Sequence, residues 1–259
     1  MKIGFIGFGN MAQAIAKGLV ASGAVPPTDL GACARDFEKL SRNTAALGCR
    51  AFASADETVR FAEVVFIAVK PHLVAEALEP LKEALTGKTV VSVAAGWTFE
   101  RYQPLLSPST GVLCSMPNTP VAVREGVVVC ERRHSLNAER HRAVSALLKN
   151  LGTVIEMDTH LMGIAGTICG CGPAYTALFI EALADAAVKH GIARADAYRM
   201  VSQMMAGTAR LQMETQQHPG AMKDAVCSPG GTTIKGVAAL EQAGFRGAVI
   251  AAVDASESK

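Results

Sequence analysis

The segment that most clearly suggests a functional role is Gly7-Phe8-Gly9-Asn10-Met11-Ala12, which follows the apolar run Ile3–Ile6. In such a G-x-G-x-x-A string the first glycine permits a tight turn and the second lets a pyrophosphate approach the backbone. The small third residue allows close packing of the next helix, whose N-terminus faces the phosphates. An ordinary βα turn is the alternative, but the position between a predicted strand and a predicted helix favours dinucleotide binding.

The second predicted strand, Leu30–Cys33, leads through Ala34 into Arg35 and Asp36. An acidic residue at this point accepts a hydrogen bond from the ribose 2′-hydroxyl of NAD(H), whereas an arginine accommodates the 2′-phosphate of NADP(H). Asp36 can equally be the N-cap of the next helix, and Arg35 can be a solvated side chain without a ligand. Because arginine comes first, the sequence predicts that NADP(H) is preferred and NAD(H) is possible.

Two further segments follow predicted strands and consist largely of small or apolar residues. Ala68-Val69-Lys70-Pro71 comes at the end of the strand Val64–Val69, and Ala94-Ala95-Gly96 comes after Val90–Val93. Ligands of open α/β sheets bind at the carboxyl ends of the strands, where small residues let a ribose or nicotinamide come close. Neither segment is specific as a local string.

One polar string stands out in the second half of the chain, Ser228-Pro229-Gly230-Gly231-Thr232-Thr233, which leads into a predicted helix Thr233–Gln242. Two glycines and a helix start present backbone N–H groups, and three hydroxyls add donors, so the string can form a small anion nest. Its donors are all neutral, which suits one carboxylate better than a polyphosphate. A capped helix entry without a ligand is the alternative.

The sequence shows no clear set of residues for acid–base catalysis or for binding a metal. Glu181, Asp185 and Lys189 recur every four residues as a polar stripe on one helix, and the six histidines are scattered singly. Cys169-Gly170-Cys171 is a close pair, but no second Cys or His cluster completes a metal site. Hydride transfer from a cofactor needs mainly positioning, so a site without a strong base remains consistent with a reductase.

The composition narrows the class of protein. The 259 residues are half hydrophobic, and 25 Lys and Arg balance 23 Asp and Glu, so neither nucleic acid nor a membrane surface is expected as a partner. We find no export signal and no run of the roughly 20 apolar residues that a membrane span needs. Seven scattered cysteines, an odd number, indicate reduced thiols and a cytoplasmic protein.

Strand and helix patterns alternate up to about residue 158 and predict a parallel sheet with helical crossovers. The expected strands are Ile3–Ile6, Leu30–Cys33, Val64–Val69, Val90–Val93 and Val112–Met116, and the expected helices are Met11–Ala21, Asp36–Leu47, His72–Leu85 and Phe99–Leu106. After residue 158 the strand patterns stop, and long helices are expected at Pro173–His190, Asp196–Gln217 and Thr233–Gln242. The predicted fold is α/β, with a Rossmann-type parallel sheet domain (1–158) followed by an all-helical domain (159–259).

Five motifs together resemble the pyrroline-5-carboxylate reductase family, in order and along essentially the whole chain: Gly7–Ala12, Ala68–Pro71, Met116–Pro120, Gly170–Tyr175 and Ser228–Thr233. The resemblance implies NAD(P)H-dependent reduction of 1-pyrroline-5-carboxylate to L-proline, the last step of proline biosynthesis. It also implies that the helical half is a substrate-binding and dimerisation domain.

The resemblance assigns roles to individual residues. The cofactor would contact Arg35 and three loops, which comprise Ile6, Gly7, Phe8, Gly9, Asn10, Met11, Ala68, Val69, Lys70, Pro71, Ala94, Ala95 and Gly96. The substrate carboxylate would lie at Ser228, Gly230, Gly231, Thr232 and Thr233, with the catalytic hydrogen bond to the ring nitrogen from Thr233. Three positions depart from the family pattern, since Cys169 and Cys171 replace serines and Ala55 replaces a frequent asparagine.

The helices Pro173–His190 and Asp196–Gln217 are apolar over more of their circumference than a domain of about 100 residues can cover. They predict an obligate homodimer, and the family resemblance implies a site that needs both subunits. Two other functions stay open. A β-hydroxyacid dehydrogenase would need a helical lysine in the cleft, for which Lys189 and Lys235 are available, and a dinucleotide-binding module without catalysis would need neither.

Overall fold

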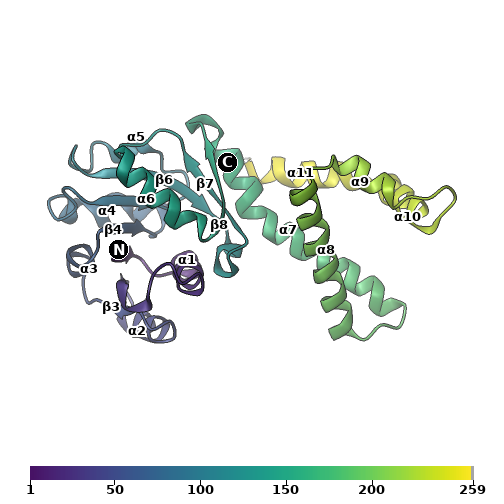
Figure 1. Cartoon of the computed structure of the whole chain (residues 1–259), viewed down its shortest axis with the longest axis horizontal. Coiled ribbons are helices and arrows are strands. Elements are labelled where there is room, and N and C mark those ends of the chain that lie inside the picture. The colour runs from purple at the N-terminus through teal and green to yellow at the C-terminus, as the bar shows by residue number, and fades with distance from the viewer. Residues whose placement is uncertain (258–259) are drawn as a thin grey trace. The chain divides into compact units, whose positions relative to one another are not determined.

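The computed structural model describes residues 1–257 and contains an eight-stranded sheet in the order β3-β2-β1-β4-β5-β6-β7-β8. Neighbouring strands pair in parallel except β6 and β7, which are antiparallel. The strands are β1 (Ile3–Ile6), β2 (Leu30–Cys33), β3 (Arg50–Ala51), β4 (Val64–Ile67), β5 (Thr89–Ser92), β6 (Gly111–Pro117), β7 (Gly126–Glu131) and β8 (Gly152–Met157). Figure 1 shows helices packed around this sheet.

Alternate side chains of the central strands enter two separate hydrophobic cores, as the period of two in a β-strand requires. Phe5 and Phe66 join a core with α1 (Asn10–Ala21), α2 (Phe37–Ala45) and α6 (Ala138–Lys149). Their neighbours Ile6 and Ile67 join a second core on the other face with α3 (Ala55–Phe61), α4 (Val74–Leu78) and α5 (Phe99–Tyr102). Burial on both faces explains why these strands are continuous apolar runs.

The predicted α/β class, with a parallel-dominated sheet followed by helices, is confirmed. Two predicted helices are wrong in length. The stretch His72–Leu85 is broken into η2 (Pro71–Leu73), α4 and η3 (Glu79–Leu81), because Pro80 has no N–H to continue the α-helical bonding. The helix expected over Phe99–Leu106 ends at Tyr102, shortly before Pro104. The prediction named none of β3, β7 and β8.

The second half contains five helices and no strand among its described residues: α7 (Met162–Lys189), α8 (Arg194–Thr215), α9 (Pro219–Ala225), α10 (Thr232–Gln242) and α11 (Phe245–Glu257). The chain divides into two compact units, Met1–Pro173 and the residues from Ala174 onward.

Helix α7 begins eleven residues before the expected start at Pro173, which lies inside it. A proline within a helix has no N–H for the carbonyl four residues earlier, here that of Cys169. The side-chain amide of Asn118 supplies the missing donor, because its Nδ2 lies 3.1 Å from the Cys169 carbonyl oxygen. The Asn118 Oδ1 accepts from the Val127 N–H at 2.8 Å. A single asparagine therefore satisfies a helix carbonyl and a strand N–H.

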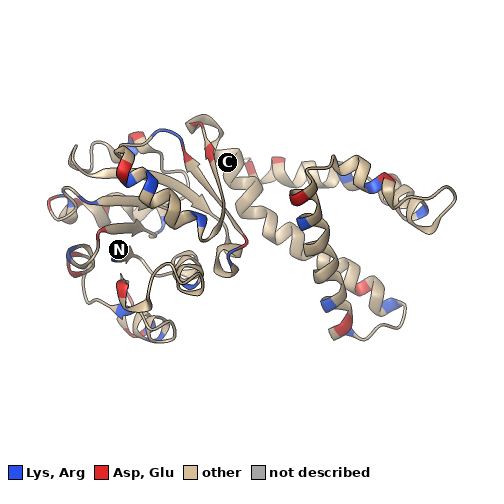
Figure 2. Ribbon diagram, in the orientation of Figure 1, with Lys and Arg blue, Asp and Glu red and all other residues tan. Residues whose placement is uncertain are grey.

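The segment Thr159–Lys189 is long and apolar enough, by length and composition, to cross a membrane, and none of its most apolar stretch is buried. Our expectation that no such segment exists was therefore wrong. The reason is that α7 starts early and its glycines, alanines and cysteines add length without adding charge. No Lys, Arg, Asp or Glu occurs in 162–180, and this first part of α7 is tan in Figure 2.

Candidate active site

A cleft of about 910 Å³ opens at the carboxyl ends of β1, β2, β4 and β5 in the first unit. Apart from Gly96, every residue that the sequence suggested for the cofactor lines it: Ile6, Gly7, Phe8, Gly9, Asn10, Met11, Arg35, Ala68, Val69, Lys70, Pro71, Ala94 and Ala95. The cleft lies beside the central β1/β4 pair, where the strand order reverses direction, which is where open α/β sheets bind ligands.

The two glycines of the first loop serve different purposes. Gly7 has φ +88°, and a Cβ there would lie 2.7 Å from the Ala68 carbonyl oxygen, so the fold itself requires glycine. Gly9 has an ordinary φ of −77°, and a Cβ there would meet nothing within 4 Å. Its open side faces the cleft, which leaves room for a ligand close to the backbone.

The N-terminus of α1 is suited to an anion. No side chain caps Gly9, and no acidic residue lies in the first turn of the helix. The first N–H groups of a helix have no intrahelical partner, and the helix dipole favours negative charge there. Together with the open backbone at Gly9, this end of the cleft fits a pyrophosphate, and the residues present fit a nicotinamide dinucleotide.

A network of buried side chains holds the third loop, Ala94–Gly96, in place. The Ser92 hydroxyl accepts from the Ala94 N–H at 3.2 Å and bonds the Tyr102 hydroxyl at 2.6 Å. Burial raises the pKa of Tyr102, so this hydroxyl keeps its proton. The indole Nε1 of Trp97 donates to the Pro71 carbonyl at 2.8 Å, which ties the third loop to the second.

Glu131 fixes the segment that follows the third loop. It is 1 % exposed, and its two oxygens accept from the Phe99 N–H at 2.7 Å and from the Thr159 hydroxyl at 2.6 Å. Burial, with Glu131 as a further cause, raises the pKa of the neighbouring Cys114 thiol, which therefore stays neutral. These residues position backbone rather than offer an acid or a base to the cleft.

Sequence reasoning missed several residues of the cleft, and all of them except Thr119 lie outside the motifs. They are Cys33, Ala34, Ala53, Ser54, Leu73, Glu76, Ala77, Val93 and Thr119. Ala55, noted only as a departure from the family pattern, also lines it. Thr119 lies in the string Met116–Pro120, a signal that was available, whereas Glu76 carries no sequence signal.

The loop Ser228–Thr233 lies in the second unit and has the geometry of a helix entry. Gly230 has φ +68°, the Gly231 N–H bonds the Ser228 carbonyl at 3.0 Å, and Gly231 becomes the N-cap of α10. A Cβ at Gly231 would lie 2.4 Å from the Ser228 hydroxyl oxygen, so the Ser228 side chain would have to turn away to accommodate one. No side chain caps α10, which leaves its first-turn N–H groups for an external acceptor.

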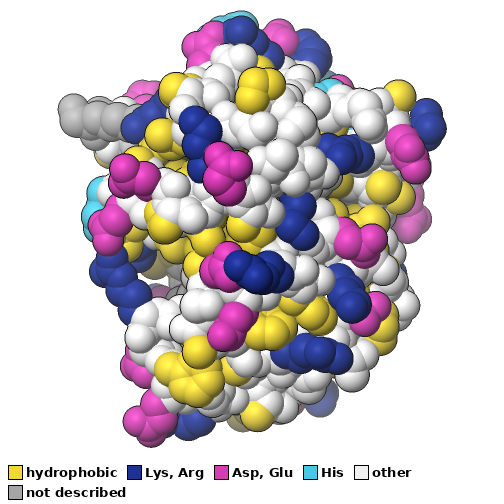
Figure 3. Space-filling model, turned by 90° about the vertical axis from the view of Figure 1, so that its left-hand side faces the viewer, with side chains coloured by type: hydrophobic (Ala, Val, Ile, Leu, Met, Phe, Trp, Pro, Cys, Tyr) yellow, Lys and Arg dark blue, Asp and Glu magenta, His cyan; other side chains and the backbone are white. Residues whose placement is uncertain are grey.

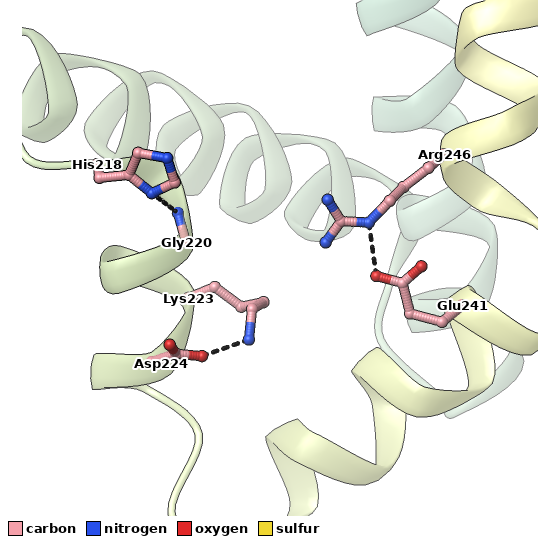
Figure 4. Close-up of polar contacts among 6 residues, drawn as sticks. All are labelled: His218, Gly220, Lys223, Asp224, Glu241 and Arg246. Atoms are coloured by element: carbon pink, nitrogen blue, oxygen red, sulfur yellow. Dashed lines mark hydrogen bonds and ion pairs between the residues drawn. The ribbon is translucent and has the colours of Figure 1, made fainter.

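Figure 4 shows polar contacts of α9, α10 and α11, the helices that precede and follow this loop in the chain. Arg246 of α11 donates through Nε to Glu241 of α10 at 2.7 Å, and Lys223 pairs with Asp224 on α9. The His218 Nδ1 accepts from the Gly220 N–H at 3.0 Å and caps α9. His218 is therefore engaged in a cap. Within residues 1–257 no group of three or more His, Cys, Asp or Glu side chains could hold a metal ion.

The fold and the cleft define a reductase-like protein with a dinucleotide-binding sheet domain followed by helices, and comparisons with known proteins identify the family. Residues 159–259 match the pyrroline-5-carboxylate reductase dimerisation family, and residues 2–96 match the family described as NADP oxidoreductase, coenzyme F420-dependent. The chain is 44% identical to the pyrroline-5-carboxylate reductase of Treponema pallidum, over 100% of this chain and 99% of that protein. The chain belongs to the pyrroline-5-carboxylate reductase family.

Two further relatives support this assignment. The chain is 39% identical to the pyrroline-5-carboxylate reductase of Escherichia coli, over 97% of this chain and 94% of that protein. The solved Plasmodium falciparum pyrroline carboxylate reductase with NADP bound superimposes with a TM-score of 0.89 at 29% identity, covering 99% of this chain and 95% of that one. The similarity therefore includes both the sheet unit and the helical unit.

Proposed function

We propose that this protein reduces 1-pyrroline-5-carboxylate to L-proline with NADPH or NADH, the last step of proline biosynthesis. The observation that carries the proposal is the full-length family relationship, at 44% identity over 100% of the chain. The cleft supports it, since its first loop pairs an obligatory Gly7 with an open Gly9 at an uncapped helix. The loop Ser228–Thr233 supplies the donors expected for a substrate carboxylate.

The chain's own residues have a positioning role in this reaction. A reduced nicotinamide dinucleotide held in the cleft would supply the hydride and become oxidised. The imine carbon would gain the C–H bond, and the C=N π electrons would move to the protonated ring nitrogen, which becomes the amine of proline. The backbone N–H groups at the start of α10 and the hydroxyls of Ser228 and Thr232 would hold the carboxylate. Thr233 would hydrogen-bond the ring nitrogen and orient the ring. A protonated imine is already electrophilic, which is consistent with a cleft lined by no histidine among its described residues.

The direct test is to incubate the purified full chain with 1-pyrroline-5-carboxylate and NADPH, and to measure both NADPH oxidation and proline formation. Thr208→Ala is the matched control for Thr233→Ala, because the Thr208 hydroxyl lies on α8 and donates to the Met204 carbonyl of the same helix. Stoichiometric proline is expected. NADPH binding without any proline would support an idle dinucleotide-binding module, and turnover of a β-hydroxyacid alone would support the dehydrogenase alternative.

The active form is proposed to be an obligate homodimer, which the helical unit supports. Among its described residues only Ala184, Ala197 and Val201 are buried. Exposed large side chains include Leu178 at 67% and Met200 at 56%. Pairing with a second copy would cover this apolar surface, as an obligate interface does.

Two experiments test the dimer. Sedimentation at low micromolar concentration should show dimers or larger assemblies, with monomers rare and inactive. Mixing chains that carry Arg35→Ala with chains that carry Thr233→Ala should give more activity than either variant has alone, if catalysis needs the cofactor cleft of one chain and the substrate loop of another. A fully active monomer would refute the proposal.

A cytoplasmic location is proposed from the thiols, because all seven cysteines are free in the structure. Figure 3 shows basic and acidic side chains interspersed on one face of the molecule, without a broad field of one sign. Cell fractionation without detergent tests the location. Recovery in the aqueous fraction is expected, whereas a requirement for detergent would instead assign the apolar surface of Thr159–Lys189 to lipid.

A further inference from the structure

The cofactor cleft contains an ion pair that the family resemblance did not suggest. The Arg35 guanidinium lies 3.6 Å from the Glu76 carboxylate, measured from NH2 to Oε1, and both residues line the cleft. Arg35 follows β2, whereas Glu76 lies in the first turn of α4. Their side chains are 76% and 74% exposed, so water screens the pair and it adds little to folding stability.

The usual acidic residue at the end of the second strand is already engaged here. The Asp36 side chain accepts from the Lys39 N–H at 2.9 Å and caps α2, and Asp36 does not line the cleft. Among the described residues that do line it, Glu76 is the one acid, and Arg35 and Lys70 are the two cations. A carboxylate therefore reaches the nucleotide-selecting position from a different element of the fold.

We propose that Glu76 is a cofactor-selecting residue that opposes Arg35 and keeps NADH usable. The inference rests on the proposed function, in that the cleft holds a nicotinamide dinucleotide. A 2′-phosphate carries a charge of about −1.5 to −2, so the negatively charged Glu76 carboxylate repels it. The phosphate also competes with Glu76 for the Arg35 guanidinium, and both effects weaken the binding of NADPH. NADH has a 2′-hydroxyl instead, which can donate a hydrogen bond to Glu76.

The size of the effect follows from simple electrostatics. One carboxylate placed roughly 6–8 Å from such a phosphate, in a medium close to water, changes the affinity about three- to tenfold. Salt weakens the interaction, because the screening length is about 8 Å at physiological ionic strength. NADH has no charge at this position, so its affinity is expected to stay the same or to fall when the carboxylate is removed.

The test compares dissociation constants for NADP⁺ and NAD⁺ by calorimetry on the full chain. Glu76→Gln should raise the ratio of the NAD⁺ constant to the NADP⁺ constant at least threefold, and Arg35→Ala should lower it. Opposite signs from two paired side chains cannot come from a general loosening of the cleft. Glu79→Gln is the matched control, since it removes the same charge from an exposed residue outside the cleft and should leave the ratio unchanged.

The outcomes separate this inference from the proposed function. If the unmodified protein binds both dinucleotides and Glu76→Gln leaves the ratio unchanged, the role of Glu76 is refuted while the cofactor assignment stands. If the unmodified protein binds neither, the cofactor assignment itself fails. A rise in the ratio that shrinks between low and high salt supports the electrostatic mechanism, and thermal melts will verify that each variant is folded.

Discussion

Asn118 offers the sharpest test of how this fold is held together. Its amide donates to the Cys169 carbonyl, which Pro173 cannot satisfy, and its oxygen accepts from the Val127 N–H. The residue is 8 % exposed. Asn118→Ala should therefore leave two partly buried backbone groups without their partner.

The expected cost follows from the number of groups left unpaired. Each unsatisfied buried group costs about 1–3 kcal/mol, and these two are only partly buried, so Asn118→Ala should destabilise the protein by about 2–4 kcal/mol. For a chain of this size, one kcal/mol lowers the melting temperature by about 2–4 °C, which predicts a fall of roughly 4–16 °C. Asn150→Ala is the control, because Asn150 bonds carbonyls at the end of α6 but is less buried, and it should cost far less.

The link to Pro173 can be isolated with a double-mutant cycle. Pro173→Ala restores a backbone N–H for the Cys169 carbonyl, so Asn118→Ala should cost about 1–2 kcal/mol less in that background. Calorimetric or fluorescence melts of the four proteins measure this coupling. Additive effects within about 0.5 kcal/mol would show that Asn118 does not replace the bond lost at Pro173, and our account of the early start of α7 would be wrong.

Three further predictions follow from the site, and a fourth concerns a partly buried thiol outside it. Arg35→Ala should weaken the affinity for NADPH about ten- to hundredfold and the affinity for NADH far less. Equal losses of affinity for both dinucleotides in a titration would exclude a contact with the 2′-phosphate. Thr233→Ala should lower turnover, by less than the roughly hundredfold typical of a lost general acid, with cofactor affinity unchanged; full activity would remove Thr233 from the site. Gly9→Ala should keep the melting temperature of the protein but weaken its affinity for the dinucleotide, whereas Gly7→Ala should lower both. The reverse pattern in melts and titrations would contradict the cleft geometry. Burial raises the pKa of the Cys49 thiol from 9.0 to about 11, so the folded state holds this proton more tightly than the unfolded state does. The free energy of unfolding should therefore fall as the pH rises from about 9 toward 11. Denaturant titrations over this pH range should show a smaller fall in the Cys49→Ala variant.

The sequence predicted the parallel strands well because burial on both faces leaves a strong pattern. Val64–Ile67 and Leu30–Cys33 are continuous apolar runs, and their bounds were predicted to within two residues. The antiparallel turn into β7 was not anticipated, although Gly126–Glu131 contains three consecutive valines. It follows a 3-10 helix, η4 (Thr119–Val123), rather than a recognisable hairpin turn.

The start of α7 could not be predicted from local rules. Proline is favoured at the first turn of a helix, so Pro173 suggested a start there. What overrides this preference is Asn118, a residue 55 positions away whose amide replaces the missing N–H donor. Glu76 was missed for a similar reason, because its approach to Arg35 depends on how α4 packs beside the end of β2.

The first cofactor loop was accessible to sequence reasoning because it depends on the absence of side chains at its two glycines. At Gly7 a methyl group would collide with the Ala68 carbonyl, and at Gly9 the backbone is open. Where the fold leaves no room for a side chain, the glycine itself is a signal that can be recognised in the sequence. Groups that act through charge at a distance, such as Glu76, leave no comparable signal.

The two units differ in how they obtain stability, and this difference bears on function. The sheet unit buries two complete hydrophobic cores, whereas the described part of the helical unit buries only Ala184, Ala197 and Val201. A unit with so little core of its own depends on further contacts to hold its helices in place. If a second copy provides them, as we propose, the loop Ser228–Thr233 keeps its geometry only in the dimer. Dimerisation would then be a condition of substrate binding as well as of stability, if the association that covers Leu178 and Met200 also orders the start of α10.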